Sequence, residues 1–180
     1  ETRGQDAYES QVDELLNSTG YGERWASVWL DQVRYADSRG LGADGRREIW
    51  KYRDWVIEAF NQDMPYDQFV REQLAGDELA GRTEQSVIAT GMLRAGTWND
   101  EPNDPQEYMY ERLEDMVDVV STAFLGITVR CARCHDHKFD PIPQRDYYRL
   151  AGAFWPGAIE PRDGKLMGGP SESELGVKEV

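Results

Sequence analysis

All the cysteines and histidines of this 180-residue chain, two of each, fall within the seven positions from Cys131 to His137. Cys131, Cys134 and His135 form the pattern Cys-x-x-Cys-His, which is typical of covalent attachment of c-type haem. Residues three apart share a helix face, so both thiols can reach the two vinyl groups of one porphyrin. The residue after the second cysteine, His135, can then bind the iron. The sequence therefore predicts one covalent haem c on Cys131 and Cys134, with His135 as the proximal iron ligand.

The sixth iron ligand is not fixed by this pattern. His137 follows His135 too closely to reach the opposite face of the same iron, so we expect it to be a polar neighbour or simply exposed. Methionine is the usual sulfur ligand, and Met64, Met109 and Met116 are the candidates. Lys138, a tyrosine or an open site with water also remain possible ligands. An open site would permit ligand binding or catalysis.

Other chemistry remains possible for the same residues. Zinc could be held by Cys131, Cys134, a histidine and a carboxylate, although structural zinc sites usually take their four ligands from two separated pairs. A redox dithiol would normally open a helix after a strand, and only the short run 126–129 before the motif is prone to form one. A purely structural cysteine pair is the remaining alternative.

The pattern of apolar residues predicts a mainly α-helical fold with long loops, because charged and apolar residues alternate with helical spacing through most of the chain. No run of residues combines strand periodicity with hairpin turn chemistry. We expect one haem domain over residues 1–160 and a tail or interdomain linker over 161–180, where Gly, Ser and Glu replace the helical pattern. The expected helices are 6–17, 22–37, 47–61, 66–77, 84–94, 107–125 and 144–154.

The charge of the chain bears on its partners. Lys plus Arg number 20 and Asp plus Glu 34, for a formal net charge of −14. An acidic surface repels nucleic acid and anionic lipid and attracts basic patches on other proteins. No apolar stretch is long enough to span a bilayer, and residues 1–10 lack the apolar core of a signal peptide. Thioether haem is normally attached outside the cytoplasm, so we expect an exported, periplasmic or extracytoplasmic protein.

These residues also resemble a known family, the planctomycete-type cytochrome c domain, which has no assigned biochemical role. The resemblance spans about residues 20–155. It implies an exported haem protein, usually one module of a larger chain with neighbouring haem domains, and it implies no reaction. The segments that carry the resemblance are 23–26, 29–31, 34–40, 47–50, 52–57, 63–69, 72–77, 125–128 and, most specifically, Cys131-Ala-Arg-Cys-His-Asp-His-Lys-Phe-Asp-Pro-Ile142.

The family pattern includes two polar segments, 35–40 and 136–142, that simple electron-transfer cytochromes do not need. Their charged side chains could surround the haem propionates, hold a calcium ion or bind a substrate; helix caps and surface ion pairs are the structural alternative. The charged and polar residues concerned are Asp37, Arg39, Asp136, His137, Lys138 and Asp140.

Three functions follow as hypotheses. The first is a monohaem electron-transfer domain that exchanges electrons with a redox partner protein or with neighbouring haem domains of the same chain. The second is a haem enzyme or ligand sensor with an open distal side. The third is a haem-free zinc or dithiol interaction module. The sequence leaves open whether the protein is an enzyme.

Overall fold

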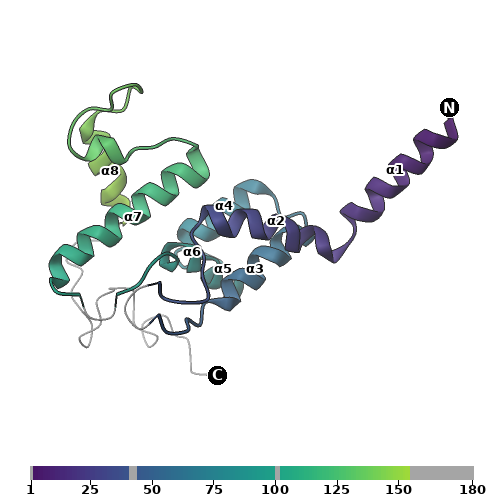
Figure 1. Cartoon of the computed structure of the whole chain (residues 1–180), viewed down its shortest axis with the longest axis horizontal. Helices are drawn as coiled ribbons and strands as arrows, with labels where there is room; N and C mark the ends of the chain where they lie inside the picture. Colours follow the sequence, from purple (N-terminus) through teal and green to yellow (C-terminus); the bar gives the residue numbers. More distant parts are fainter. Residues whose placement is uncertain (1, 41–43, 100–101, 155–180) are drawn as a thin grey trace. The chain divides into compact units, whose positions relative to one another are not determined.

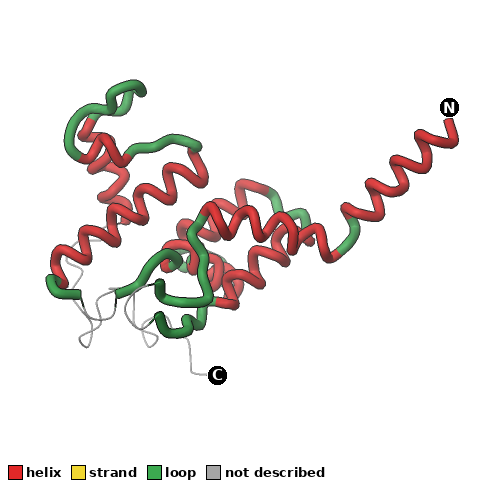
Figure 2. Tube along the Cα trace, in the orientation of Figure 1, coloured by secondary structure: helices red, strands yellow, loops and turns green. Residues whose placement is uncertain are grey.

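The protein is mainly α-helical, as the periodicity predicts. The computed structural model describes residues 2–40, 44–99 and 102–154. Within those ranges helices joined by loops make up the chain, and the only strand-like pairing is an isolated antiparallel bridge between Ser38 and Arg46 (Figures 1 and 2). The predicted tail over 161–180 lies outside the described residues.

The helices correspond closely to the predicted ranges. Each of the seven expected helices has a counterpart that matches it to within a few residues at one or both ends, and the helix expected over 144–154 matches at both ends. The elements are α1 (Thr2–Leu16), α2 (Thr19–Gln32), α3 (Trp50–Asn61), α4 (Tyr66–Ala75), α5 (Glu84–Ala89), α6 (Gly91–Arg94), α7 (Pro105–Leu125), the short 3-10 helix η1 (Arg130–Arg133) and α8 (Gln144–Phe154).

The predicted end of the second helix at residue 37 is wrong, because α2 stops at Gln32. Arg34 adopts a left-handed conformation with φ of 55°. The backbone N–H of Tyr35 then donates to the carbonyl of Leu30 at 2.9 Å, which closes the helix in the way that a glycine usually does. Since arginine is not the residue expected at such a position, the sequence carries no signal for this stop.

The predicted helix over 84–94 is divided into α5 and α6 at Thr90. The Thr90 hydroxyl donates to the carbonyl of Val87 at 2.7 Å, a local bond that competes with regular helix geometry. Gly91 follows, and a Cβ built there would lie 2.8 Å from the Cβ of Tyr52. The glycine therefore allows the start of α6 to approach α3 closely.

The chain forms two compact units, unit 1 (Glu1–Trp98) and unit 2 (Asn99–Val180). The expected single domain over residues 1–160 stays a prediction, because this division does not test whether either unit folds alone. In unit 1, α1 projects beyond the other helices (Figure 1), and Val12 is the one partly buried side chain among those described in it.

The core of unit 1 is built from aromatic and small side chains on α2, α3, α4 and α6. Trp55 stacks on Phe69 at 5.4 Å between ring centroids, and Trp29 meets the same ring edge-on at 5.0 Å. On α2 the buried positions are Gly22 and Ala26, and Val33, directly after the helix, is buried as well. Trp25, also on α2, is 48% exposed.

A buried polar network fixes how α2, α3 and α4 meet. The Gln73 side chain is fully buried, and its carbonyl oxygen accepts from the Tyr52 hydroxyl at 2.7 Å and from the Trp29 indole at 2.9 Å. Its amide donates to the Phe69 carbonyl at 3.0 Å. Burial also raises the pKa of Tyr52, so its hydroxyl keeps the proton that it donates.

Unit 2 consists of the long helix α7 with η1 and α8 packed along it. The Asp104 carboxylate accepts from the backbone N–H groups of Gln106 and Glu107, and Pro105 occupies the first turn, so α7 begins two residues earlier than predicted. Gly126, with φ of 65°, ends it. The core residues of the unit are Val117, Val129, Ala132, Tyr147 and Ala151, with Leu113, Ile142, Leu150 and Phe154 against them.

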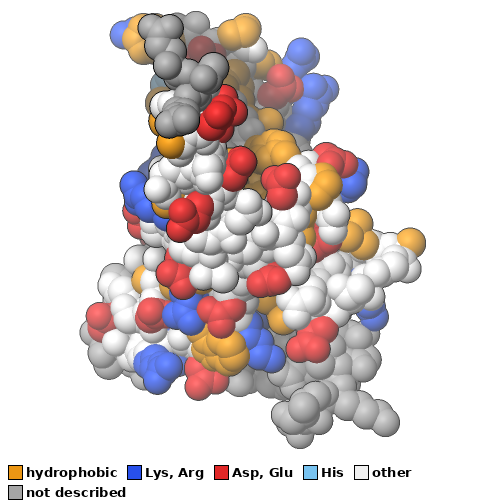
Figure 3. Space-filling view, turned by 90° about the vertical axis from the view of Figure 1, so that its right-hand side faces the viewer, with side chains coloured by type: hydrophobic (Ala, Val, Ile, Leu, Met, Phe, Trp, Pro, Cys, Tyr) orange, Lys and Arg blue, Asp and Glu red, His pale blue; other side chains and the backbone are white. Residues whose placement is uncertain are grey.

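The surface carries charges of both signs. On the face drawn in Figure 3, Asp and Glu side chains are interspersed with Lys and Arg side chains. Among the described helices, none combines the length and the apolar composition that a membrane crossing needs.

Candidate functional site

The Cys-x-x-Cys-His motif lies on η1 and the loop that follows it in unit 2. A 3-10 helix has three residues per turn, so side chains three apart lie on the same side. Val129 and Ala132 point into the core of the unit. Cys131 and Cys134 lie on another side, and both are free thiols exposed to solvent. The structure thus presents the two cysteines together, one turn apart, as the sequence predicts.

The remaining side of η1 is attached to α7 through two arginines. Arg130 and Arg133 both contact the carboxylate of Glu114: Arg130 Nε lies 3.1 Å from Oε1, and Arg133 pairs with Oε2. The Glu114 side chain is only 14% exposed, whereas the side chains of Arg130 and Arg133 are 66% and 49% exposed. Glu114 was not a candidate in the sequence, since 16 and 19 residues separate it from its partners.

His135 is exposed directly after this turn. Its Nδ1 lies 2.7 Å from the backbone oxygen of Asp136. A carbonyl oxygen can only accept, so Nδ1 carries the proton and the lone pair of the neutral ring is on Nε2. Among the described residues, none provides a hydrogen-bond partner for Nε2. In metal-binding histidines the second ring nitrogen usually donates to a carbonyl or carboxylate, so this arrangement is compatible with the role predicted for His135.

Asp136 connects His135 to the start of α8. Its backbone oxygen accepts a hydrogen bond from the His135 imidazole, while its carboxylate accepts one from the backbone N–H of Gln144 at 2.8 Å. Gln144 is the first residue of α8, and an acidic group near a helix N-terminus is stabilised by the unpaired N–H groups there. Asp136 therefore has a structural role, one of those that the sequence left open.

Two further side chains of α8 hold the end of η1. The carbonyl of Arg133 accepts from the Gln144 side chain at 2.9 Å and from the Tyr148 hydroxyl at 3.0 Å. Gln144 and Tyr148 are one helical turn apart, so they share a face of α8. The sequence shows this spacing, but it gives no reason to connect that face with the cysteines.

His137 has a structural role in the same loop. Its side chain is only 7% exposed, and its Nδ1 accepts from the backbone N–H of Asp140 at 2.9 Å. The Asp140 carboxylate lies 3.1 Å from the same nitrogen, and this contact would be a hydrogen bond only if Nδ1 carried a proton. We assign Nδ1 as an acceptor because the N–H of Phe139 also points to it, at 3.4 Å. The expectation of a polar neighbour fits this geometry better than simple exposure.

The segment 138–140 is otherwise open to solvent. Phe139 is 84% exposed, and the ammonium group of Lys138 lies 5.1 Å from the centre of its ring. Phe139 lies four residues after His135, on the same loop as this predicted iron ligand.

The methionine candidates for the distal ligand are divided between the two units. Met109 and Met116 lie two turns apart on α7 and are partly buried, and Met64 lies in unit 1, in the loop between α3 and α4. The distal ligand therefore stays a prediction, with Met64, Met109 and Met116 as its candidates.

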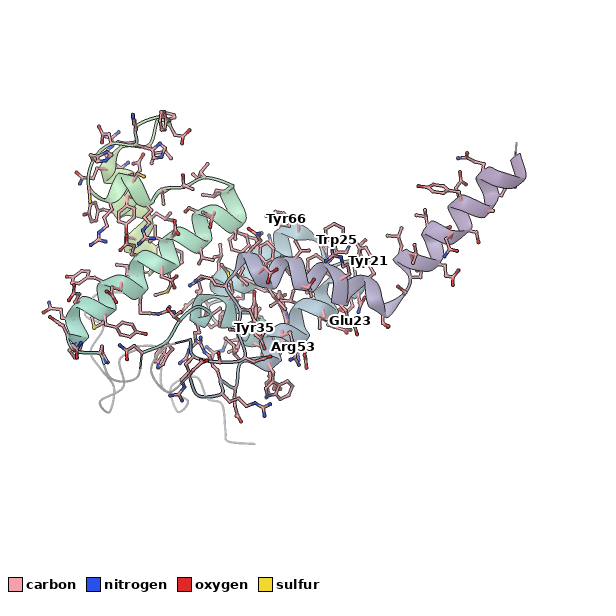
Figure 4. All side chains as sticks on the ribbon, in the orientation of Figure 1. Tyr21, Glu23, Trp25, Tyr35, Arg53 and Tyr66 are labelled. Carbon is pink, nitrogen blue, oxygen red and sulfur yellow. The ribbon has the colours of Figure 1, made fainter. Side chains whose placement is uncertain are left out.

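The other polar segment of the sequence, 35–40, forms a cluster in unit 1. The Tyr35 hydroxyl donates to Asp37 at 2.6 Å, and Arg53 lies 3.9 Å from the same carboxylate; Figure 4 shows Tyr35 and Arg53 side by side. Partial burial, and then the hydrogen bond to Asp37, raise the pKa of Tyr35 to about 12. Asp37 and Arg39 thus belong to unit 1, whereas Asp136, His137, Lys138 and Asp140 belong to unit 2.

No three Cys, His, Asp or Glu side chains within the described ranges are arranged to hold a metal ion on their own. The calcium and zinc sites considered from the sequence remain predictions.

The fold and the motif define a mainly helical protein whose exposed Cys-x-x-Cys-His turn packs against a long helix. The chain matches the model of the PSCyt2 family, described as a protein of unknown function (DUF1549), over residues 1–157, and it belongs to that family. Comparison with curated proteins and with solved structures yields no match.

Proposed function

We propose that this chain is a c-type haem domain that carries electrons, and that it is one module of a larger exported redox protein. The observation that carries the proposal is the geometry of η1 and the loop after it. Two exposed thiols lie on one side of a single turn, and the next residue is an imidazole with an available Nε2. These three groups have the chemistry that covalent haem attachment needs.

The thiols support attachment because they are both paired in space and accessible. Cys131 and Cys134 are one 3-10 turn apart, and the rest of η1 is already occupied, by the core on one side and by Glu114 on another. A porphyrin bound through both thiols would therefore meet the solvent-facing side of η1. The residues present fit the group that the motif implies.

The histidine supports iron ligation because its tautomer is set in advance. The proton on Nδ1 is directed to the Asp136 carbonyl, which leaves Nε2 as the nitrogen for the metal. Asp136 also caps α8, so the ring is oriented by a helix rather than by a mobile chain. A ligand oriented in this way loses little conformational entropy on binding.

The bound haem would supply one-electron redox chemistry at iron. Cys131 and Cys134 would anchor the haem, and His135 would bind its iron. Asp136 would orient His135 by accepting a hydrogen bond from its Nδ1–H. The negative net charge of −14 would favour association with a redox partner that carries a basic surface.

The test uses the protein made in a host with cytochrome c maturation machinery, with intact mass and the pyridine haemochrome spectrum as readouts. We expect a mass raised by one haem and a c-type spectrum. In the same host, the double variant Cys131→Ser/Cys134→Ser should have the mass of the unmodified chain. His135→Ala with its haem retained should have an altered spectrum. A wild-type chain of unmodified mass would overturn the proposal and favour the zinc or dithiol alternatives.

A haem enzyme or ligand sensor with an open distal side is the second candidate. The exposure of Cys131, Cys134 and His135 favours it, as does the lack of any methionine between Gly126 and Phe154, the segment that builds the site. Carbon monoxide added to the reduced haem protein separates the two candidates. A spectral change would favour the open site, and an unchanged spectrum would favour two strong axial ligands.

A further inference from the structure

We propose that unit 1 carries a binding site for a small organic anion, a molecule with a phosphate or carboxylate group attached to a compact apolar body. The site is a groove of about 350 Å³. It lies outside the Cys-x-x-Cys-His motif and is independent of the haem proposal. The side chains used in the argument are Arg39, Arg47, Glu48, Ile49, Arg94 and Trp98.

The charge of the groove is opposite to that of the whole chain. Among the described residues, three arginines line it together with one carboxylate, Glu48, in a protein whose formal net charge is −14. An anion bound in the groove would be attracted by each of these guanidinium groups. Arginine is also the side chain best suited to phosphate and carboxylate, because its planar fork matches two oxygens at once.

The groove is built by segments that hydrogen bonds hold together. The Arg47 guanidinium donates to the carbonyl of Gly96 and to that of Arg94, and its carbon lies 5.9 Å from the centre of the Trp98 ring. The backbone N–H of Trp98 donates to the carbonyl of Arg39 at 2.8 Å. The Arg47 guanidinium and the backbone of Arg39 are therefore positioned before any ligand arrives, which lowers the entropy lost on binding.

Arg94 completes the cationic set from the last turn of α6. Its side chain is exposed, and it forms no hydrogen bond or ion pair with the residues that the structure describes. Its guanidinium can therefore move to meet an incoming anion. Since only its backbone carbonyl takes part in the local hydrogen bonds, the side chain can be replaced without loss of the groove.

The apolar part of the ligand follows from the other lining residues. Trp98 and Ile49 are both partly buried in the wall of the groove. An indole ring offers a flat apolar surface to a ring or short hydrocarbon, while the arginines take the charged end. A bare inorganic ion would use only the charged half of the site.

The test measures binding of inorganic phosphate and of phenyl phosphate to the full chain by isothermal titration calorimetry, at constant ionic strength. We expect both to bind, with phenyl phosphate several-fold tighter because it also contacts the apolar wall. Arg94→Gln should weaken both by roughly tenfold, which is the usual effect of losing a charged hydrogen bond. Arg94→Lys should recover part of the affinity.

Arg24→Gln is the matched control, because it removes the same charge from an exposed position on α2 of the same unit. We expect it to bind both probes as the wild type does. The proposal is overturned if neither probe binds at millimolar concentration, or if Arg94→Gln and Arg24→Gln have equal effects, since binding would then reflect only overall charge. Binding of phosphate with no preference for phenyl phosphate would overturn the assignment of an apolar body. None of these outcomes depends on whether haem is attached.

Discussion

Removal of the Glu114 charge should loosen η1 while the rest of unit 2 stays folded. Glu114→Gln deletes the carboxylate that pairs with Arg130 and Arg133 and retains a side chain of the same size. An exposed ion pair contributes about 0.2–1 kcal/mol. Both arginines are well exposed, at 66% and 49%, but Glu114 is sheltered, so we expect values near the upper end for each pair.

The two pairs together then stabilise η1 by about 1–2 kcal/mol, and glutamine recovers part of this through its carbonyl oxygen. A net loss of about 1 kcal/mol would raise the population of locally open η1 roughly fivefold, since 1.4 kcal/mol corresponds to a factor of ten. Unit 2 as a whole loses less, because its apolar core is unchanged.

Native-state hydrogen exchange at the Ala132 amide measures this opening. Ala132 is fully buried, and its N–H donates to the Val129 carbonyl at 2.9 Å, so its exchange requires η1 to open. We expect exchange about fivefold faster in Glu114→Gln, with Val117 on α7 unaffected. Glu111→Gln is the control: it removes the same charge from an exposed position on α7. Equal rates in wild type and Glu114→Gln, or equal acceleration by the control, would refute the reasoning.

Three further predictions concern stability. Gln73→Leu should lower the free energy of unfolding by about 2 kcal/mol because the buried Tyr52 hydroxyl loses its acceptor. The double variant with Tyr52→Phe should lose less than the sum of the two single variants. Additive values from urea denaturation would contradict this. The pKa of Tyr35 is raised to about 12, so the stability that its neutral hydroxyl contributes is complete below pH 10 and is lost as the pH rises to 12. The free energy of unfolding should therefore fall over that window, and less steeply in Asp37→Asn. Phenol absorbance and unfolding measured at each pH check this. Asp104→Ala should cost about 1 kcal/mol in thermal or chemical unfolding, because the cap of α7 is lost; an unchanged midpoint would count against the cap.

The sequence predicts the helices well where their ends carry conventional signals. Asp104 and Pro105 begin α7, Gly126 ends it, and α8 has the predicted bounds. Where a helix ends on an unusual residue, the prediction fails: Arg34 in a left-handed conformation ends α2 five residues early. Long-range packing also overrides periodicity, since Trp25 lies on the solvent side of α2 while Ala26 is buried.

The candidate site likewise combines features that the sequence predicts with features that only the structure reveals. The types and spacing of Cys131, Cys134 and His135 are local properties, so the sequence alone identifies them. The interactions that position them join segments far apart, such as Glu114 with η1, or depend on a backbone conformation, such as the carbonyl of Asp136 beside the imidazole. Spacing along the chain does not encode either kind of contact, and the electron-transfer role and the haem itself stay predictions.

Asp136 makes the orientation of His135 depend on a helix rather than on a loop. The backbone oxygen of Asp136 accepts a hydrogen bond from the imidazole, and its carboxylate accepts one from the first N–H of α8. A rotation of the ring and a displacement of α8 are therefore linked through one residue. Pressure on α8 from a docked partner or a neighbouring domain would thus turn the imidazole. A ligand bound at Nε2 would in turn report the position of α8.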